Sequence, residues 1–152
     1  MVYQDYSQNR PHSKRDSQSK PKMPDIIEAE PLPEDYVEKA EEVIKGLIDK
    51  KINITTSKIR NLLSFVSEIY NIENNRDDPE LLPRSQSLLT MMRIRTVYEA
   101  GRERKTVKVF VEDAKLLQHI KDIGKSREKL IDFSHYMEAL VAYHRFYGGK
   151  EG

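Results

Sequence analysis

Apolar residues recur along most of the chain with the spacing of amphipathic helices. From residue 34 onward they repeat every three or four positions, which places them on one helical face. No segment shows the alternation of a half-buried strand. The helices predicted from this pattern span residues 34–50, 56–70, 80–100, 106–123 and 126–147. The sequence therefore predicts an all-α fold, a compact bundle of about five helices.

Residues that favour helix ends agree with these boundaries. Thr55 or Thr56 is a natural N-cap for the second helix, and Ser126 for the fifth, because a hydroxyl accepts a hydrogen bond from first-turn N–H groups. Two glycines at 148–149 follow the fifth helix, where glycine commonly ends helices. The polar run NIENNRDDPE, residues 71–80, is predicted to be a loop.

Two of the predicted helices lack a single apolar face. The helix over residues 80–100 is apolar on most sides, which predicts a central position in the bundle. The helix over residues 106–123 carries two apolar strips. One strip is expected to face the core, and the other either a second core helix or a partner subunit. The second strip contains Val109, Leu116, Ile120 and Ile123.

The first 33 residues have a different composition from the rest. They hold five of the seven prolines, many Ser, Gln and Lys, and no apolar periodicity. Such a segment buries too little apolar surface to fold alone. We predict a disordered proline-rich arm over residues 1–33, a helical domain over residues 34–149 and a short tail over residues 150–152.

Composition excludes several classes of protein. The chain has no cysteine, so disulfides, thiolate metal sites and cysteine nucleophiles are excluded. No apolar run approaches the roughly 18 residues of a membrane span, and the N-terminus lacks the apolar stretch of a signal peptide. We therefore expect a cytoplasmic protein. The net charge is +1, yet residues 34–92 carry −3 and residues 93–152 carry +4.

The residue patterns of common enzymes and metal sites are missing. The sequence contains no H-E-x-x-H helix, no glycine-rich phosphate loop and no G-x-S-x-G elbow. Asp132 and His135 have metal-ligand spacing, but a single pair of this kind is common by chance. His144 lies on the apolar face of its helix and is interpreted as a hydrogen-bonded core histidine. We expect a protein without catalytic activity, metal or cofactor.

Basic residues cluster where the predicted helices begin or end. Lys58 and Arg60 lie in the first turn after the threonine cap, where exposed N–H groups also favour an anion. A second cluster is RIRTVYEAGRERK, residues 93–105. The third consists of Lys125, Arg127 and Lys129. Because alternate ends of antiparallel helices come together, these three clusters are expected to share one face.

The second cluster divides on a helical wheel. Gly101 is expected to end the helix and to form the turn that presents Arg102. Arg95 lies near apolar positions and is expected to pair with Glu99 four residues later. Arg93 is expected to be exposed. Tyr136, Tyr143 and Tyr147 lie within about 40° of one another on the last helix, which suits either packing or a subunit interface.

Four segments resemble a known family. They are TTSKIRNLL (55–63), IRTVYEAGR (94–102), VKVFVEDAKL (107–116) and SREKLIDFSHYMEALVAYHRFYGG (126–149). In order and spacing they resemble the small subunit of the type III-A CRISPR effector, the Csm complex. The resemblance covers about residues 53–149 and leaves the proline-rich arm outside it.

The resemblance implies a non-catalytic helical subunit that stacks in several copies as the inner filament of a ribonucleoprotein. Its implied partners are CRISPR RNA, target RNA, other copies of itself and the backbone, large and capping subunits of the complex. It implies phosphate contacts to the guide–target duplex from Lys58, Arg60, Arg93, Arg95, Arg102 and Arg127. Arg104 is added on local charge alone. Contacts between subunits are expected from Leu116, Ile120, Tyr136, Tyr143 and Tyr147.

Two other functions are consistent with the residues alone. The segment TTSKIRNLLSFV resembles the recognition helix of a helix-turn-helix DNA-binding regulator, although the residues before it lack a tight turn with glycine. A helical adaptor that binds no nucleic acid is the other alternative. In that case the arginines form ion pairs within the protein.

Overall fold

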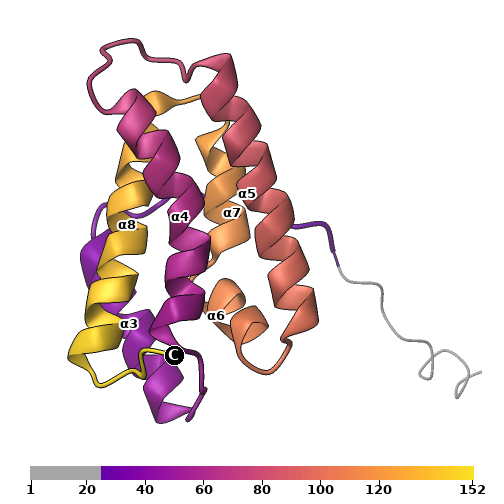
Figure 1. Ribbon diagram of the computed structural model, residues 1–152, viewed down its shortest axis with the longest axis vertical. Helices are drawn as coiled ribbons and strands as arrows, with labels where there is room; N and C mark the ends of the chain where they lie inside the picture. The colour runs from indigo at the N-terminus through magenta and orange to yellow at the C-terminus, as the bar shows by residue number, and fades with distance from the viewer. Residues whose placement is uncertain (1–24) are drawn as a thin grey trace, which may run out of the picture.

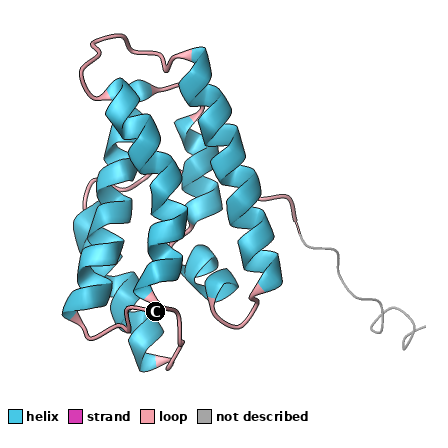
Figure 2. Cartoon of the chain, viewed as in Figure 1, coloured by secondary structure: helices cyan, strands magenta, loops and turns pink. Residues whose placement is uncertain are grey.

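Six helices make up the regular structure of residues 25–152, the part of the chain that this computed structural model describes (Figure 1). They are α3 (Tyr36–Asp49), α4 (Thr56–Glu73), α5 (Pro83–Arg102), α6 (Val107–Asp113), α7 (Leu116–Ile123) and α8 (Arg127–Phe146). Figure 2 shows helices joined by loops, and the one β-type contact in these residues is an isolated bridge between Glu80 and Ser126. The predicted all-α fold is confirmed.

Hydroxyl caps fix the starts of two helices as predicted. The Thr55 side chain accepts a hydrogen bond of 3.3 Å from the Lys58 N–H, and Ser126 accepts one of 3.2 Å from the Lys129 N–H. The end of α4 lies three residues beyond the predicted one. Glu73 extends the helix because its carboxylate is buried and bonded to residues of the next loop and helix.

Helix α8 has the most extensive packing in the bundle, against α3, α4 and α7. Its buried residues include Leu130, Phe133, Met137 and Leu140. Helix α5 was expected in a central place and is instead at an edge, where it packs on α4, α6 and α7. Four of its apolar side chains remain exposed. They are Met91, Ile94, Val97 and Tyr98, each between 52% and 61% exposed.

The predicted helix over residues 106–123 is broken in two. Lys115 has a left-handed backbone with φ of 53°, and it separates α6 from α7. The break turns the second half of the segment, so both apolar strips face the same core. Leu116 is 0% and Ile120 is 3% exposed. The expectation that these two residues contact a partner subunit is therefore wrong.

Residues 25–33 form an extended strap across α7. The Glu30 N–H donates to the Gln118 carbonyl at 3.1 Å, and the Glu30 carboxylate pairs with Lys115 at 3.1 Å. Leu32 packs against the core. The prediction of disorder is wrong for this stretch, because its backbone and side chains have partners on α7. The rest of the predicted arm, residues 1–24, lies outside the described residues.

Candidate nucleic-acid interface

The two cations in the first turn of α4 lie on different sides of the helix. Lys58 forms an ion pair with Glu103, just beyond the end of α5. Arg60, two residues later, points away from it and pairs with Glu151 at 2.7 Å. Arg145 of α8 also holds Glu151, at 2.8 Å. The structure therefore separates the two residues that the sequence analysis treated as one cluster.

The exposed start of α4 does not offer a free anion site. The N–H groups of Thr56 and Ser57 donate to the carbonyls of Lys150 and Glu151, at 2.7 and 2.9 Å. The Ser57 hydroxyl also donates to the Glu151 carbonyl, at 2.6 Å. These N–H groups already have acceptors in the tail, so the proposed phosphate site at this helix terminus is not supported.

A groove runs between α4 and α5 near the end of the bundle where α4 begins. It encloses about 470 Å³. Three cations line it, namely Lys58 from α4 and Arg95 and Arg102 from α5. Other lining residues are Asn61, Leu62, Ser64, Phe65, Glu99 and Val107. We call this feature the α4–α5 groove. It combines cations, polar groups and one aromatic ring on a solvent-facing surface.

The pairing of the α5 arginines is the reverse of the expected one. Helix α5 continues through Gly101, and Arg102 is its last residue. Arg102 holds Glu99 at 3.0 Å and Glu103 at 3.6 Å. Arg95 is exposed and has no carboxylate within ion-pair distance among residues 25–152. Arg95, expected to be structural, is thus the cation of the groove most available to an external anion.

Carboxylates partly neutralise the groove. A hydrogen bond from Lys58 is the largest of the effects that place the pKa of Glu103 below its ordinary value, and the charges of Lys58 and Arg102 act in the same direction. Glu103 is therefore ionised at neutral pH. An entering phosphate would compete with Glu103 for Lys58, but it would meet no such competitor at Arg95.

Two other candidate arginines lie outside the groove. Arg93 is exposed and does not line the groove, because two residues along a helix turn the side chain by about 200° from Arg95. Arg104 lines a separate, mostly apolar cavity that also contacts Ile27, Val97 and Gly101. The structure therefore does not group Arg93 and Arg104 with the groove cations.

Arg127 lies at the opposite end of the bundle. Its guanidinium donates to the Glu73 and Asn74 carbonyls at 2.8 and 3.2 Å, so it caps the end of α4. That end is about 22 Å along the helix from Lys58, at 1.5 Å per residue. The three basic clusters thus do not share one face, and Arg127 has a structural role.

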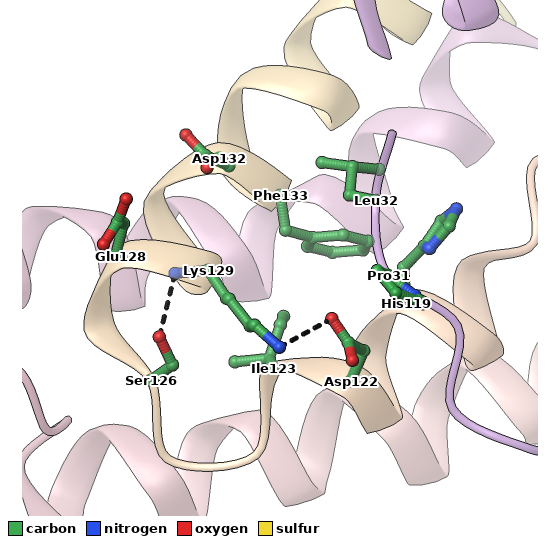
Figure 3. A pocket seen from close by; sticks show the side chains of 10 residues that line it. All are labelled: Pro31, Leu32, His119, Asp122, Ile123, Ser126, Glu128, Lys129, Asp132 and Phe133. Atoms are coloured by element: carbon green, nitrogen blue, oxygen red, sulfur yellow. Dashed lines mark hydrogen bonds and ion pairs between the residues drawn. The ribbon is translucent and has the colours of Figure 1, made fainter. Parts of the chain in front are cut away.

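A hollow at this opposite end has the wrong charge for a polyanion. It encloses about 300 Å³ between the strap, α7 and α8 (Figure 3). Asp122, Glu128 and Asp132 line it, against the single cation Lys129, which is paired with Asp122 at 3.1 Å. Excess carboxylate makes this hollow unfavourable for phosphate.

The predicted tyrosine interface is partly buried. Tyr136 is 3% exposed and donates its hydroxyl to the Ala114 carbonyl at 2.9 Å, so it cannot contact another subunit. Burial also raises the pKa of Tyr136. Tyr143 and Tyr147 are half-buried and stacked at 6.2 Å, and the Tyr147 hydroxyl donates to Glu41 of α3. These two retain some surface beside α3.

His144 is held in the core by hydrogen bonds to two other residues. His144 is 3% exposed, with Nδ1 2.8 Å from the Thr56 hydroxyl and Nε2 3.0 Å from the Ile54 carbonyl. This confirms the interpretation of a hydrogen-bonded core histidine. Within residues 25–152, no three His, Asp or Glu side chains converge as metal ligands. No helix in this range is long and apolar enough to span a membrane.

Three groove residues were missed by the sequence analysis. Asn61, Ser64 and Phe65 line the groove on the α4 side. Two of them were within reach of sequence reasoning, because Asn61 and Phe65 follow Lys58 at intervals of three and seven and so share its helical face. Ser64 has no such signal.

Comparison with known proteins gives a consistent result. A family model described as Csm2 Type III-A matches residues 30–150. A protein of Streptococcus thermophilus named CRISPR system Cms protein Csm2 is 46% identical over 121 residues, which cover 78% of this chain and 95% of that protein. A protein of the same name from Mycobacterium tuberculosis is 39% identical over 122 residues, 79% of this chain and 97% of that protein. The family match includes α3 and is longer than the resemblance found from sequence.

Proposed function

The chain belongs to the Csm2 family and is a small subunit of a type III-A CRISPR complex, and from this premise we propose that its α4–α5 groove holds the duplex of CRISPR RNA and target RNA. The contacts are to phosphates. A subunit that serves many guides cannot depend on base identity, and phosphate contacts carry no sequence information.

The observation that carries the proposal is that Arg95 has no carboxylate within ion-pair distance among residues 25–152. Its side chain is exposed in a groove that it shares with Lys58 and Arg102. A guanidinium can donate two parallel hydrogen bonds to one phosphate, which suits it to this task. Asn61 adds a neutral amide donor for sugar or phosphate oxygens on the opposite wall, where the Ser64 hydroxyl already donates to the Asn61 carbonyl.

In this function the subunit binds and positions RNA without catalysing a reaction. Several copies line the duplex as the inner filament, beside the backbone, large and capping subunits of the effector complex. An open array of identical copies needs a head-to-tail contact between two different surfaces of each copy. Capture of target RNA in this way supports antiviral defence.

The helix-turn-helix alternative is disfavoured by the position of α4. A recognition helix must enter the major groove of DNA, which is about 12 Å wide. Helix α4 is packed on both sides, by α5 and by α8 (Figure 1), and buries Ile59, Leu62 and Val66 between them. Helix α4 is thus held between two helices and does not project from the bundle as a recognition helix does.

The test is target-RNA binding by the assembled complex across a salt series. We expect Arg95→Ala to lower affinity at least about tenfold for every guide sequence and to reduce the slope of log affinity against log salt by about one for each copy that contacts the duplex. Arg104→Ala is the matched control. It removes an exposed arginine outside the groove and should leave both quantities unchanged.

Two results would contradict the proposal. If Arg95→Ala and Lys58→Ala leave the affinity and its salt slope unchanged, the groove does not hold RNA. If the purified chain binds duplex DNA with sequence preference and has no affinity for RNA duplex, the regulator alternative replaces this one.

A further inference from the structure

The outer face of α5 is unusually apolar for a surface helix. Met91, Ile94, Val97 and Tyr98 are each more than half exposed, and they form a continuous crest along the helix. Contiguous exposed apolar side chains usually mark an interaction site rather than ordinary surface. We call these four residues the α5 crest.

The surroundings of the crest are cationic. Helix α5 contains four arginines and one glutamate, a net charge of +3. Arg84, Arg93 and Arg95 are exposed, and none of them has a carboxylate within ion-pair distance in the part of the chain that the structure describes. The helix therefore presents apolar side chains bordered by cations that have no partner within residues 25–152.

The outer face of α3 has the complementary character. Residues 34–50 contain six carboxylates and three lysines, a net charge of −3. Five of the carboxylates are exposed, namely Glu34, Asp35, Glu38, Glu42 and Asp49. Val37 and Ile48 are 42% and 38% exposed, and their spacing of eleven residues places them within about 20° of each other on the helical wheel and about 16 Å apart along α3.

One aromatic ring extends this acidic face. Phe146, at the end of α8, is 77% exposed and lies edge-on to Tyr147 at 5.1 Å between ring centroids. Tyr147 donates to Glu41, so the Tyr147 ring links Phe146 to α3. We call the exposed carboxylates of α3 together with Val37, Ile48 and Phe146 the α3 face.

The two surfaces lie on opposite sides of the molecule. Helix α3 packs mainly on α8, whereas α5 packs on α4, α6 and α7, and Figure 1 shows the two helices at opposite sides of the bundle. One chain therefore cannot bring its own crest to its own α3 face. A second copy can, and the same contact then repeats from copy to copy.

We propose that the α5 crest of one copy docks on the α3 face of the next. Ile94 and Tyr98 are covered by the apolar residues of the α3 face, and Arg84 and Arg93 meet its carboxylates, while Arg95 stays in the α4–α5 groove. The inference rests on the proposed function, which requires repeated copies but does not say which surfaces join them.

RNA is a poorer occupant of the crest. A paired duplex keeps its bases stacked inside and presents sugars and phosphates, so aliphatic side chains such as Ile94 and Val97 find no apolar partner there. A symmetric contact between two crests is also disfavoured, because it would bring the unpaired arginines of both copies together without a counter-charge.

Cross-linking with introduced cysteines tests the contact directly, because the chain has no cysteine of its own. Ile94→Cys and Ile48→Cys variants are treated with a short bismaleimide, singly and as a mixture, within the assembled type III-A complex. We expect a two-chain product from the mixture and none from either variant alone.

Charge reversal on the two surfaces is the second test of the docking contact. Adding Arg84→Glu and Arg93→Glu to the Ile94→Cys chain should reduce the cross-linked product at least about tenfold. Placing Glu38→Arg and Glu42→Arg in the Ile48→Cys partner should restore it. The isolated Arg84→Glu chain keeps every cation that the family resemblance assigns to RNA, so its affinity for RNA duplex should remain that of wild type.

The outcomes separate this inference from the proposed function. A product from Ile94→Cys alone, or no product from the mixture, would overturn the docking contact even if Arg95→Ala still weakens RNA binding. Loss of RNA affinity in the isolated Arg84→Glu chain would assign the crest to RNA instead. If the mixture still gives the cross-linked product but Arg95→Ala does not change RNA affinity, only the proposal that the groove binds RNA is rejected.

Discussion

Thr56 and His144 lie 88 residues apart in the sequence and meet in a buried hydrogen bond of 2.8 Å between the threonine hydroxyl and Nδ1. The other ring nitrogen, Nε2, lies 3.0 Å from the Ile54 carbonyl. Because a carbonyl only accepts, Nε2 carries the proton of the neutral ring, and Nδ1 accepts from the hydroxyl. The imidazole thus joins the start of α4 to the end of α8.

Replacing His144 by Leu should lower the free energy of unfolding by about 1–3 kcal/mol, since the Ile54 carbonyl loses its donor and the Thr56 hydroxyl keeps only the Lys150 carbonyl, at 3.1 Å. Urea denaturation followed by circular dichroism measures this change. His135→Gln is the control. Its side chain is exposed and should contribute less than about 0.5 kcal/mol. Equal effects of the two substitutions would contradict the structural role of His144.

His144 also makes stability depend on pH. Burial lowers the pKa of His144 below its ordinary value, and the hydrogen bond to Ile54 offsets this only in part. As pH falls below about 6.5, the unfolded chain takes up a proton that the folded chain resists, so the free energy of unfolding decreases. The difference in unfolding midpoint between wild type and His144→Leu should therefore become smaller as the pH is lowered from 8 to 5.5.

Glu73 is a second buried polar centre, at 0% exposure. Its carboxylate accepts from the Leu82 N–H at 2.9 Å and the Ser85 hydroxyl at 2.6 Å, and it pairs with Arg76. Burial alone would raise the pKa of Glu73, but the hydrogen bonds from Ser85, Leu82 and Arg76 outweigh it and the pKa is lowered. The carboxylate therefore remains charged inside the protein.

Glu73→Ala should destabilise the fold by about 3 kcal/mol, because Arg76 and the loop donors lose their acceptor. Glu68→Ala, on the exposed side of the same helix, should change stability by less than about 0.5 kcal/mol. Thermal denaturation of both variants checks the difference. A mild effect at Glu73 would mean that the loop after α4 closes without it.

These two centres show why the helices were predictable and their connections were not. Periodicity placed α4 and α8 correctly, because burial of one face depends on local spacing. Glu73 reads as a polar loop residue in NIENNRDDPE, and only its partners Leu82 and Ser85, nine and twelve residues later, make it helical. Likewise, Lys115 breaks its helix in a conformation for which its residue type gives no signal.

At Gly101 the structure differs from the sequence-based expectation, because α5 does not end at this glycine. It lies inside α5, and an added Cβ would meet no atom within 4 Å. Gly101→Ala should therefore raise the free energy of unfolding by about 0.5–1 kcal/mol, because alanine restricts the unfolded chain and favours helix. A loss of stability would restore the expectation that the helix ends at this glycine.

At Gly124 an alanine is expected to have the opposite effect on stability. Its φ is +53°, so an alanine there is strained even though space is available. Gly124→Ala should destabilise by about 1 kcal/mol. Calorimetry of the two variants should thus give melting temperatures that move in opposite directions.

Glu103 is expected to weaken RNA binding, because it occupies Lys58 at the end of the groove. Glu103→Gln should raise the affinity of the assembled complex for target RNA by about two- to fivefold, the range for loss of one exposed competing ion pair. Glu112→Gln removes an exposed carboxylate outside the groove and should have no effect. Reduced affinity in Glu103→Gln would show that Glu103 positions Lys58 rather than competing for it.

The site was less predictable from sequence than the fold. Residue type identified every cation of the groove, but it could not show which of them are already paired. Arg102 and Arg95 are alike in sequence context, yet the helix turn brings Glu99 to Arg102 and leaves Arg95 alone. The Arg60–Glu151 pair joins residues 91 apart, which no local pattern indicates.

Helix α4, which carries one wall of the groove, is held at both ends by other parts of the chain. Its first N–H groups donate to the tail at Lys150 and Glu151, and its last carbonyls accept from Arg127. Helix ends normally fray and exchange their amide hydrogens quickly. If the groove holds RNA as proposed, a pull on that RNA would be transmitted into α8 instead of unwinding α4. The Thr56 and Ser57 amides should exchange as slowly as those of the helix interior.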